Sequence, residues 1–261
     1  MIRINWYFIE THTHLGLIKK NSEEVIREAV AEKVIKMVNI GIDLVSSKAS
    51  IDLASRFDGV YSAIGFHPHE AKFLTSENLK GLKELAKQPK VVAIGEIGLD
   101  YYWQHSSIES QRKAFIQQIY LARDFRLPII IHDREAHLEV LDILDKEAKG
   151  SKILLHCFSG DLDFARLCIE RGYLLGIGGV VTFPKARKLV EVIQYAPLEN
   201  IVLETDSPYL TPHPFRGKPN EPKYIPLIAE KIAQLKKVDL EVVARATSIN
   251  AHSFFGLKDK E

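Results

Sequence analysis

The feature that most constrains the fold of this chain is a regular alternation of short apolar runs and longer segments with helical periodicity. Eight runs read as strands, at residues 6–14, 34–40, 60–66, 91–96, 129–132, 153–156, 173–177 and 201–204. Helical segments lie between them, at 22–30, 46–57, 78–87, 108–125, 136–148, 162–171 and 187–195, and two more follow at 224–236 and 240–254. Strands that alternate with helices in this way form a parallel sheet.

The sequence therefore predicts a single (β/α)8 TIM barrel over residues 1–261, with an active site at the C-terminal ends of the strands. A chain of 261 residues with 46% hydrophobic content is long enough for one barrel or for two smaller domains, and we find no linker or repeat in it. An open doubly wound sheet is the alternative fold. No glycine-rich phosphate loop follows the first strand, and this argues against a domain that binds a nucleotide cofactor.

The composition limits the classes of partner. Lysine and arginine total 35 against 34 acidic residues, a net charge of +1, which argues against a general polyanion binder held by a basic surface. The two cysteines, Cys157 and Cys168, are too few for a disulfide framework and indicate a reducing compartment. No segment reads as a signal peptide or a membrane span, so we expect a cytoplasmic protein without membrane contacts, and we favour a monomer.

Polar residues stand where the predicted strands end. The positions are His12, His14, His67, Glu96, His132, His156 and Asp206, each at or near the end of an apolar run. The strand ends of a barrel meet at one site, so these side chains are expected to gather. A single strand-end histidine more often packs or bonds locally, but several together favour a metal site. Four imidazoles and two carboxylates from this set would serve two ions that share a carboxylate.

These residues belong to motifs that resemble the TatD family of metal-dependent deoxyribonucleases, within the amidohydrolase superfamily. The resemblance covers nearly the whole chain and rests on residues 10–15, 65–69, 95–100, 132–136, 156–160, 204–210, 216–222, 250–251 and 254–256. The chain departs from the family pattern in two places: Glu10 stands where aspartate is more common, and Asp133 where serine is common. Neither departure removes a ligand.

The resemblance implies a metal-binding role for each strand-end donor. In proteins of this kind the His-x-His pair and the last aspartate hold one divalent ion, which points to His12, His14 and Asp206. The glutamate of the fourth strand bridges both ions, which points to Glu96, and histidines of strands five and six hold the second ion, which points to His132 and His156. Mg, Mn and Zn all remain possible ions. Asp206 and Glu96 are the expected catalytic residues, and Asp206 can take the proton from the attacking water.

Other residues are expected around the metal site. Glu10 shares strand parity with the His-x-His pair, and Glu204 shares it with Asp206, so both would face inward and could hold ligand histidines by their second N–H. Pairing with a buried cation is the alternative for these two carboxylates. We expect His67 to contact a substrate phosphate, and His69 to pack or cap.

Candidates for substrate binding lie on the loops after the strands. Tyr101, Tyr102 and Trp103 could stack on unpaired bases, and Arg134, Arg216 and Lys218 could engage phosphate oxygens. Ordinary packing is the alternative for the aromatics. The proline-rich loop 211–222 suits a fixed rim more than a mobile lid.

The resemblance implies a deoxyribonuclease that acts on DNA, exonucleolytically on single-stranded ends. A bound hydroxide does not by itself choose the electrophile, so the alternative is a hydrolase of another bond, such as a D-aminoacyl-tRNA ester or a small ester or amide. Glu96 stands where many amidohydrolases use a modified lysine, and this favours the nuclease. A non-catalytic barrel that serves as a scaffold is disfavoured because all six ligand positions are filled.

Overall fold

The computed structural model describes residues 6–257. Its strands are β1 (Phe8–Thr13), β2 (Val34–Ile40), β3 (Val60–Ile64), β4 (Val91–Asp100), β5 (Ile129–Arg134), β6 (Ile153–Leu155), β7 (Leu174–Ile177) and β8 (Ile201–Leu203). Its α-helices are α1 (Ser22–Ala31), α2 (Leu44–Arg56), α3 (Ser76–Leu85), α4 (Ile108–Phe125), α5 (His137–Glu147), α6 (Leu162–Glu170), α7 (Arg187–Tyr195), α8 (Ile225–Lys236) and α9 (Leu240–Phe255). Short 3-10 helices are η1 (Leu15–Leu17), η2 (Pro68–Phe73), η3 (Gly179–Thr182), η4 (Leu198–Asn200) and η5 (Pro222–Tyr224).

The order of the strands defines the fold class. The described strands follow one another in sequence order from β1 to β8 within one sheet. The pairs β3–β4, β4–β5, β5–β6 and β7–β8 are parallel. The chain after β8 lies beside β1, because Thr13 and Ser207 form a parallel bridge. Parallel strands in sequence order, each followed by a helix, define a (β/α)8 barrel, so the predicted fold class is confirmed.

The chain divides into two compact units. Within the described residues, unit 1 comprises residues 6–37 and 160–253, and unit 2 comprises residues 38–159 and 254–257. The boundary between residues 37 and 38 falls inside β2, and the boundary between residues 253 and 254 falls inside α9. That residues 1–261 form a single domain stays a prediction.

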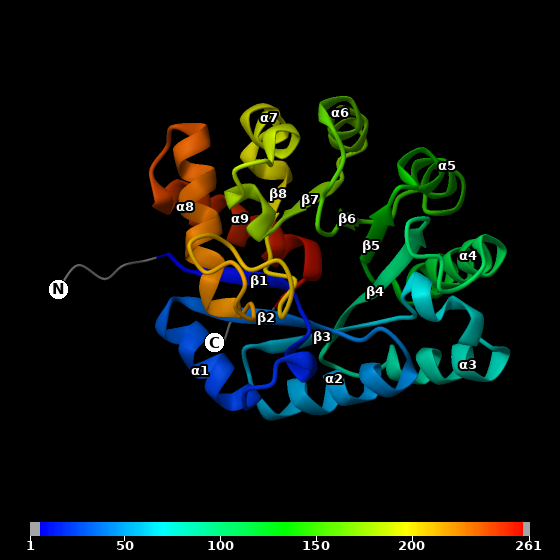
Figure 1. Cartoon of the computed structure of the whole chain (residues 1–261). Helices are drawn as coiled ribbons and strands as arrows, with labels where there is room; N and C mark the ends of the chain where they lie inside the picture. Colours follow the sequence, from blue (N-terminus) through cyan, green and yellow to red (C-terminus); the bar gives the residue numbers. More distant parts are fainter. Residues whose placement is uncertain (1–5, 258–261) are drawn as a thin grey trace. The chain divides into compact units, whose positions relative to one another are not determined.

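Unit 1 is built around β1, β7 and β8. All six residues of β1 are buried, as are the three of β8. Helix α6 packs beside α7, and α7 beside α8 (Figure 1, green through orange). Strands buried on both faces read as continuous apolar runs, which is why β8 is simply Ile-Val-Leu.

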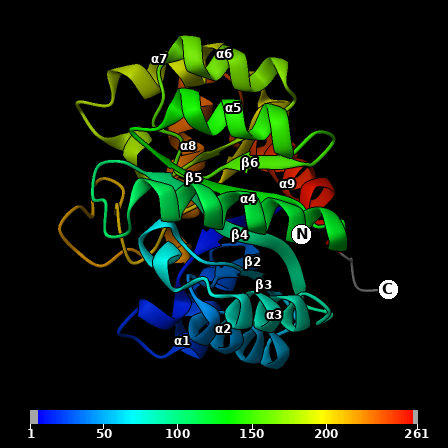
Figure 2. The ribbon, with the colours of Figure 1, turned by 90° about the vertical axis from the view of Figure 1, so that its right-hand side faces the viewer.

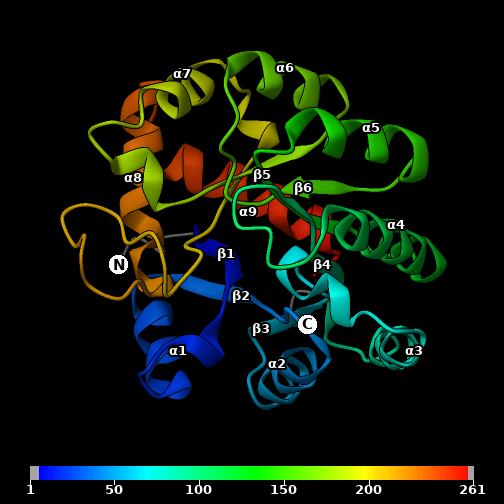
Figure 3. The same cartoon turned by 45° about the vertical axis from the view of Figure 1, so that its right-hand side comes forward.

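Unit 2 contains the parallel run from β3 to β6. Helix α2 packs against β3 and α3 (Figure 3), and α4 runs alongside α5 (Figure 2). All ten residues of β4 are buried, including its two carboxylates, Glu96 and Asp100. The core of this unit therefore carries ionisable groups inside an otherwise apolar strand.

Strand β4 extends further than the predicted strand at 91–96. It pairs with β5 as far as Asp100, which lies opposite Arg134. The extension requires glycine at position 98, because a Cβ there would lie 2.0 Å from the carbonyl oxygen of His132 and the φ angle of Gly98 is 145°. Glycine commonly weakens a strand, whereas Gly98 permits a close approach of two backbones here.

Helix α2 begins two residues before the predicted start at Ser46. Asp43 is the reason: its side chain accepts a hydrogen bond from the backbone N–H of Ser46, and the Ser46 side chain accepts one from the backbone N–H of Asp43. This reciprocal capping box satisfies two N–H groups at the helix start, so the helix begins at Leu44.

The sequence analysis expected no membrane-spanning segment. Among residues 6–257, none of the helices combines the length and the apolar character that a membrane span requires.

Candidate metal centre

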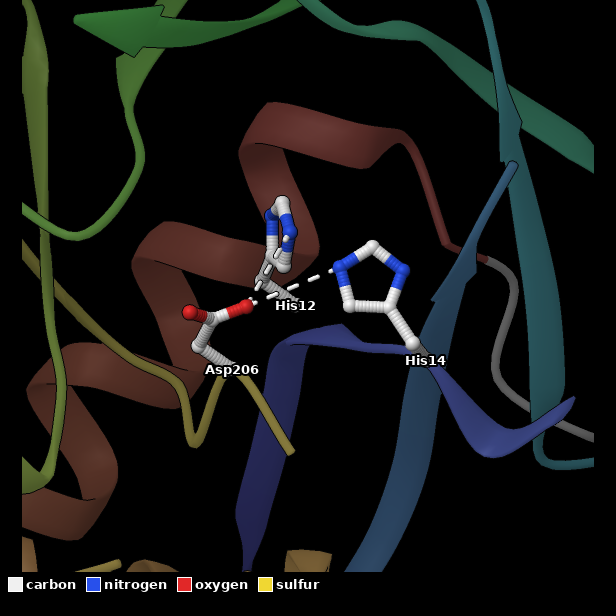
Figure 4. A group of neighbouring side chains, drawn as sticks. All are labelled: His12, His14 and Asp206. Atoms are coloured by element: carbon white, nitrogen blue, oxygen red, sulfur yellow. Dashed lines mark ion pairs between the residues drawn. The ribbon is translucent and has the colours of Figure 1, made fainter. Parts of the chain in front are cut away.

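Unit 1 brings His12, His14 and Asp206 together, and we call these residues the first donor group. The histidines lie two residues apart at the end of β1, so their side chains project to the same side, and Asp206 follows β8 (Figure 4). The Asp206 Oδ1 atom lies 3.9 Å from His12 Nε2 and 3.6 Å from His14 Nε2. His12 is fully buried, and His14 is 7% exposed. These three donors are close enough to serve one ion.

The segment that carries Asp206 is fixed to β1 by its backbone. The Asp206 N–H donates to the carbonyl of His12 at 2.9 Å, and the His14 N–H donates to the carbonyl of Ser207 at 2.9 Å. Asp206 itself has a φ of 55°, a left-handed conformation that is uncommon outside glycine. The donors on β1 and after β8 are therefore held in register by two backbone hydrogen bonds.

Asn220 holds the same segment from the other side. Its Nδ2 donates to the carbonyls of Thr205 (2.8 Å) and Tyr209 (2.6 Å), and its Oδ1 accepts from the N–H of Glu221 (3.0 Å). Asn220 is completely buried. The side chain of Asn220 thus joins the two ends of the segment 205–209, which contains Asp206.

We expect Asn220→Ala to lower the free energy of unfolding by about 2–4 kcal/mol, because two buried carbonyls lose their donor. Urea unfolding followed by circular dichroism measures the change. Asn78→Ala is the control, since the Asn78 amide makes an exposed bond to Phe73 and should cost about 1 kcal/mol or less. Equal losses for the two variants would contradict the bracketing role of Asn220.

Glu10 supports the first donor group through the backbone. Its Oε1 accepts from the N–H of His12 (2.9 Å) and of Thr205 (3.0 Å), and its Oε2 accepts from the Thr205 hydroxyl (2.6 Å). Burial raises the pKa of Glu10 to about 8, although these hydrogen bonds lower it. The carboxyl group of Glu10 thus accepts from the backbone N–H of the ligand His12 and from that of Thr205, the residue before Asp206. That Glu10 also holds a ligand imidazole stays a prediction. Glu204, the other expected support, is buried.

Unit 2 brings His67, His132 and His156 around Glu96, and we call these four residues the second donor group. The Glu96 Oε1 atom lies 2.6 Å from His132 Nδ1, 3.4 Å from His156 Nε2 and 3.5 Å from His67 Nε2. Glu96 lies on β4, His132 on β5, and His156 directly after β6. The strand-end donors of this unit therefore converge on one carboxylate oxygen.

His67 differs from the other histidines in the tautomer that its contacts select. Its Nδ1 accepts a hydrogen bond from the backbone N–H of His69 at 3.1 Å. Burial lowers the pKa of His67 to about 4 despite the nearby charge of Glu96, so the ring is neutral at pH 7. The single proton of a neutral ring that accepts at Nδ1 lies on Nε2. His67 is thus a hydrogen-bond donor within the group, which suits contact with a phosphate oxygen better than metal ligation.

Asp100, at the end of β4, holds two histidines, and the sequence analysis did not identify it. Its Oδ2 lies 3.0 Å from His132 Nε2 and 3.0 Å from His69 Nε2. Its Oδ1 accepts from the N–H groups of Tyr102 (3.0 Å) and Trp103 (2.9 Å). Burial alone would raise the pKa of Asp100, but the hydrogen bonds from His132 and Trp103 outweigh it and hold the pKa well below its usual range. Asp100 therefore stays ionised and orients the His132 ring.

The His132 imidazole lies between two carboxylates. Burial lowers its pKa, but the hydrogen bonds to Asp100 and Glu96 outweigh burial and raise the pKa to about 9. With Nε2 held by Asp100, the Nδ1 atom faces Glu96 at 2.6 Å, and it would ligate an ion after giving up its proton. A histidine that ligates a metal through one nitrogen commonly donates its other N–H to a carboxylate in this way.

We expect Asp100→Ala to weaken metal binding at the second donor group by about 10- to 100-fold, the usual effect of removing a carboxylate that orients a ligand histidine. Titration of the chelated protein with Mn²⁺ or Zn²⁺ against a competing indicator measures the dissociation constant. Asp142→Asn, at an exposed carboxylate of α5 that pairs with Lys146, is the matched control. An unchanged dissociation constant in Asp100→Ala would show that Asp100 does not position His132.

The donor sets fit divalent cations. In unit 1 the ligand atoms of His12, His14 and Asp206 all lie within 4.8 Å of one another. In unit 2 the Glu96 Oε1 atom lies 2.6 Å from His132 Nδ1 and 3.4 Å from His156 Nε2. Neutral imidazole with carboxylate suits zinc, manganese, iron and similar ions. Because both sets contain nitrogen and oxygen, the donor chemistry leaves the identity of the ion open.

The aromatic residues after β4 carry a cation on their faces. The Arg134 guanidinium lies 4.3 Å from the ring centroid of Tyr102 and 5.8 Å from that of Trp103. Both rings are about half exposed, at 52% and 53%. Tyr101 has a structural contact instead, because its hydroxyl donates a hydrogen bond to Glu139 at 2.7 Å. The rings of Tyr102 and Trp103 are therefore partly exposed, with Arg134 over both of them and with His105 stacked on Trp103 at a centroid distance of 6.0 Å.

The other predicted cations lie on the loop after β8, in unit 1. Arg216 lies 3.9 Å above the ring of Phe183, and the Lys218 ammonium lies 5.6 Å from the ring of Phe215. Tyr209 places its ring 6.4 Å from that of His14. The sequence analysis missed Phe183 and Tyr209. Tyr209 stood three residues after Asp206, which was a usable signal, whereas the position of Phe183 had none.

Comparisons with known proteins agree with this geometry. A family model described as TatD related DNase matches residues 9–256. An uncharacterized metal-dependent hydrolase of Bacillus subtilis, YabD, is 44% identical over 249 residues, covering 94% of this chain and 98% of the relative. The 3′-5′ ssDNA/RNA exonuclease TatD of Salmonella typhimurium is 35% identical over 242 residues, covering 90% and 93%. The crystal structure of YJJV, a TatD homologue from Escherichia coli K12, matches with a TM-score of 0.91 at 29% identity, covering 96% of this chain and 98% of that one.

The fold and the two donor groups are those of a metal-dependent hydrolase built on a (β/α)8 barrel. The matched length and the similarity to the relatives settle the family. This chain belongs to the TatD family of metal-dependent hydrolases.

Proposed function

We propose that this protein is a divalent-metal-dependent nuclease that hydrolyses phosphodiester bonds at single-stranded ends of DNA. The observation that carries the proposal is the pair of largely buried imidazole–carboxylate groups. One lies at the end of β1 and after β8 in unit 1, and the other lies on β4, on β5 and directly after β6 in unit 2. The name of the Salmonella relative, 3′-5′ ssDNA/RNA exonuclease TatD, supports the same reaction.

The proposal includes two divalent ions, Mg, Mn or Zn. His12, His14 and Asp206 would hold the first, and Glu96, His132 and His156 the second. Bound ions lower the pKa of water and offset negative charge on the phosphate oxygens. That Glu96 is also a ligand of the first ion stays a prediction of the family resemblance.

The protein's own groups have separate tasks in this proposal. Asp206 is 15% exposed, more than the histidines beside it, so its carboxylate can accept the proton of an attacking water. The Nε2–H of His67 can donate to a phosphate oxygen. Glu10 and Asp100 position ligands and touch no substrate.

Strand binding would use the exposed aromatic faces and the cations of the loops. Tyr102 and Trp103 can stack on unpaired bases, while Arg134, Arg216 and Lys218 engage phosphates. Stacking needs unpaired bases, so a single-stranded end is a better substrate than an intact duplex. The proposal places the enzyme in the cytoplasm, as its low cysteine content indicates, and as a monomer.

Substrate choice is tested on the purified protein with one added metal. End-labelled single-stranded DNA and D-aminoacyl-tRNA are supplied in parallel, each with and without EDTA. We expect shortening of the DNA from one end, abolished by EDTA, and little release of the amino acid. A strong preference for the aminoacyl ester would replace the nuclease proposal with the esterase alternative.

A further inference from the structure

We propose that two adjoining pockets of unit 1, separated by the stacked pair Phe183 and Arg216, hold two consecutive nucleotides of the strand whose end lies at the first donor group. This inference rests on the proposed nuclease function and adds two subsites to it. It also assigns a substrate-binding role to Phe183, Lys185 and His213.

The near pocket begins beside the first donor group. It has a volume of about 520 Å³, and its lining includes Tyr209, Lys19, Arg216 and Lys218. The backbone N–H of Tyr209 donates to the carbonyl of Asp206 at 2.9 Å, so this pocket starts three residues from a metal donor. A nucleotide in it would adjoin the nucleotide that is cleaved.

The far pocket shares Phe183 and Arg216 with the near pocket. It has a volume of about 500 Å³, and its lining includes Lys185 and His213 together with Phe183 and Arg216. The ring of His213 packs edge-on against Phe183, with the centroids 6.3 Å apart. Both volumes lie within the range of about 300–1,000 Å³ that is typical of small-ligand sites.

The two residues that both pockets share, Phe183 and Arg216, are carried by loops that pack closely against each other. A Cβ at Gly179 would lie 2.2 Å from the carbonyl oxygen of Leu210, so the close approach of the loops requires glycine. The N–H of His213 donates to the hydroxyl of Thr182 at 2.9 Å. The Arg216 guanidinium, 3.9 Å above Phe183, is therefore presented to both pockets from a fixed support.

The lining chemistry matches a nucleic acid strand. Lysine and arginine side chains line both pockets, and neither lining contains an aspartate or a glutamate. Each pocket also exposes an aromatic ring, Tyr209 in the near one and Phe183 in both. Cations beside aromatic faces are the arrangement that binds phosphates and unpaired bases together without a sequence preference. The two pockets thus repeat one nucleotide-sized set of contacts.

The test compares Phe183→Ala and Lys185→Ala with Lys188→Ala, an exposed lysine of α7 outside both linings. The first measurement is fluorescence anisotropy of a labelled phosphorothioate decanucleotide on the metal-loaded protein. Loss of one base stack or phosphate contact should weaken binding by about 5- to 30-fold. Lys188→Ala should bind as the wild type does. Circular dichroism confirms that each variant is folded.

The second measurement separates the subsites from the chemistry. In the wild type, KM should fall from a dinucleotide to a tetranucleotide, and this fall should shrink in both variants. Hydrolysis of bis(4-nitrophenyl) phosphate, which does not need the far pocket, reports on the metal site of each sample, and Lys188→Ala should match the wild type in it. If both variants match Lys188→Ala in anisotropy and length dependence, the inference is wrong and the nuclease proposal stands. If the wild type neither binds nor cleaves any strand, the proposed function fails and the inference falls with it.

Discussion

Asp206→Asn should lower the rate of single-strand cleavage on the order of 10³-fold while the protein stays folded. The amide keeps the shape of the carboxylate, but it carries no charge for an ion and cannot take up a proton from water. Because Asp206 Oδ1 lies within 3.9 Å of both His12 Nε2 and His14 Nε2, the substitution also removes the charged member of the first donor group. Initial rates on end-labelled DNA measure the effect.

Asp163→Asn is the matched control for this variant. Asp163 lies in the same unit, on α6, and its side chain is 88% exposed, so its loss should leave the rate within about two-fold of wild type. A rate for Asp206→Asn close to that of the control would exclude Asp206 from the reaction. Metal analysis of the same samples shows whether the loss comes with a lost ion.

Gly98→Ala should destabilise the protein by about 3 kcal/mol or more and weaken metal binding at the second donor group. The added Cβ would lie 2.0 Å from the carbonyl oxygen of His132, and a φ of 145° is rarely adopted by alanine. Since the obstructing atom is backbone, β4 and β5 must separate, and His132 moves with β5. The measurements are urea unfolding and a Mn²⁺ titration.

Gly150→Ala separates the two contributions to this effect. Gly150 has a φ of 78°, but a Cβ there meets nothing within 4 Å. It therefore reports the cost of the backbone conformation alone, about 1 kcal/mol, with no change in metal affinity. If Gly98→Ala cost no more than Gly150→Ala, the close approach of β4 to β5 would not be required for folding.

The strand-helix alternation was sufficient to predict the fold class, because buried parallel strands leave a clear record of short apolar runs. The end of β4 was not predictable in the same way. Glycines at 95 and 98 normally weaken a strand, and only the position of the β5 backbone shows that Gly98 allows the pairing to continue to Asp100. Asp100 lies four residues beyond the predicted end of this strand, and the sequence analysis included it in the motif 95–100 without giving it a role.

The strand-end donors were predicted from position, and the structure gathers them within each unit. What the sequence could not supply is the second contact of each side chain. The choice of His132 Nδ1 depends on Asp100 binding Nε2, and the proton on His67 Nε2 depends on the N–H of His69. Such contacts depend on the lengths and directions of neighbouring strands and loops, and a pattern of residue types does not record these.

Metal stoichiometry measured together with activity tests the central claim most directly, namely that the two donor groups hold ions on which hydrolysis depends. The protein is stripped with EDTA, reloaded stepwise with Mn²⁺, and assayed on end-labelled single-stranded DNA at each step. We predict two ions per chain, no cleavage by the stripped protein, and a rate that returns with loading in the wild type but not in Glu96→Gln. Full cleavage by the stripped protein, or a Glu96→Gln variant that binds two ions and cleaves at the wild-type rate, would contradict the claim.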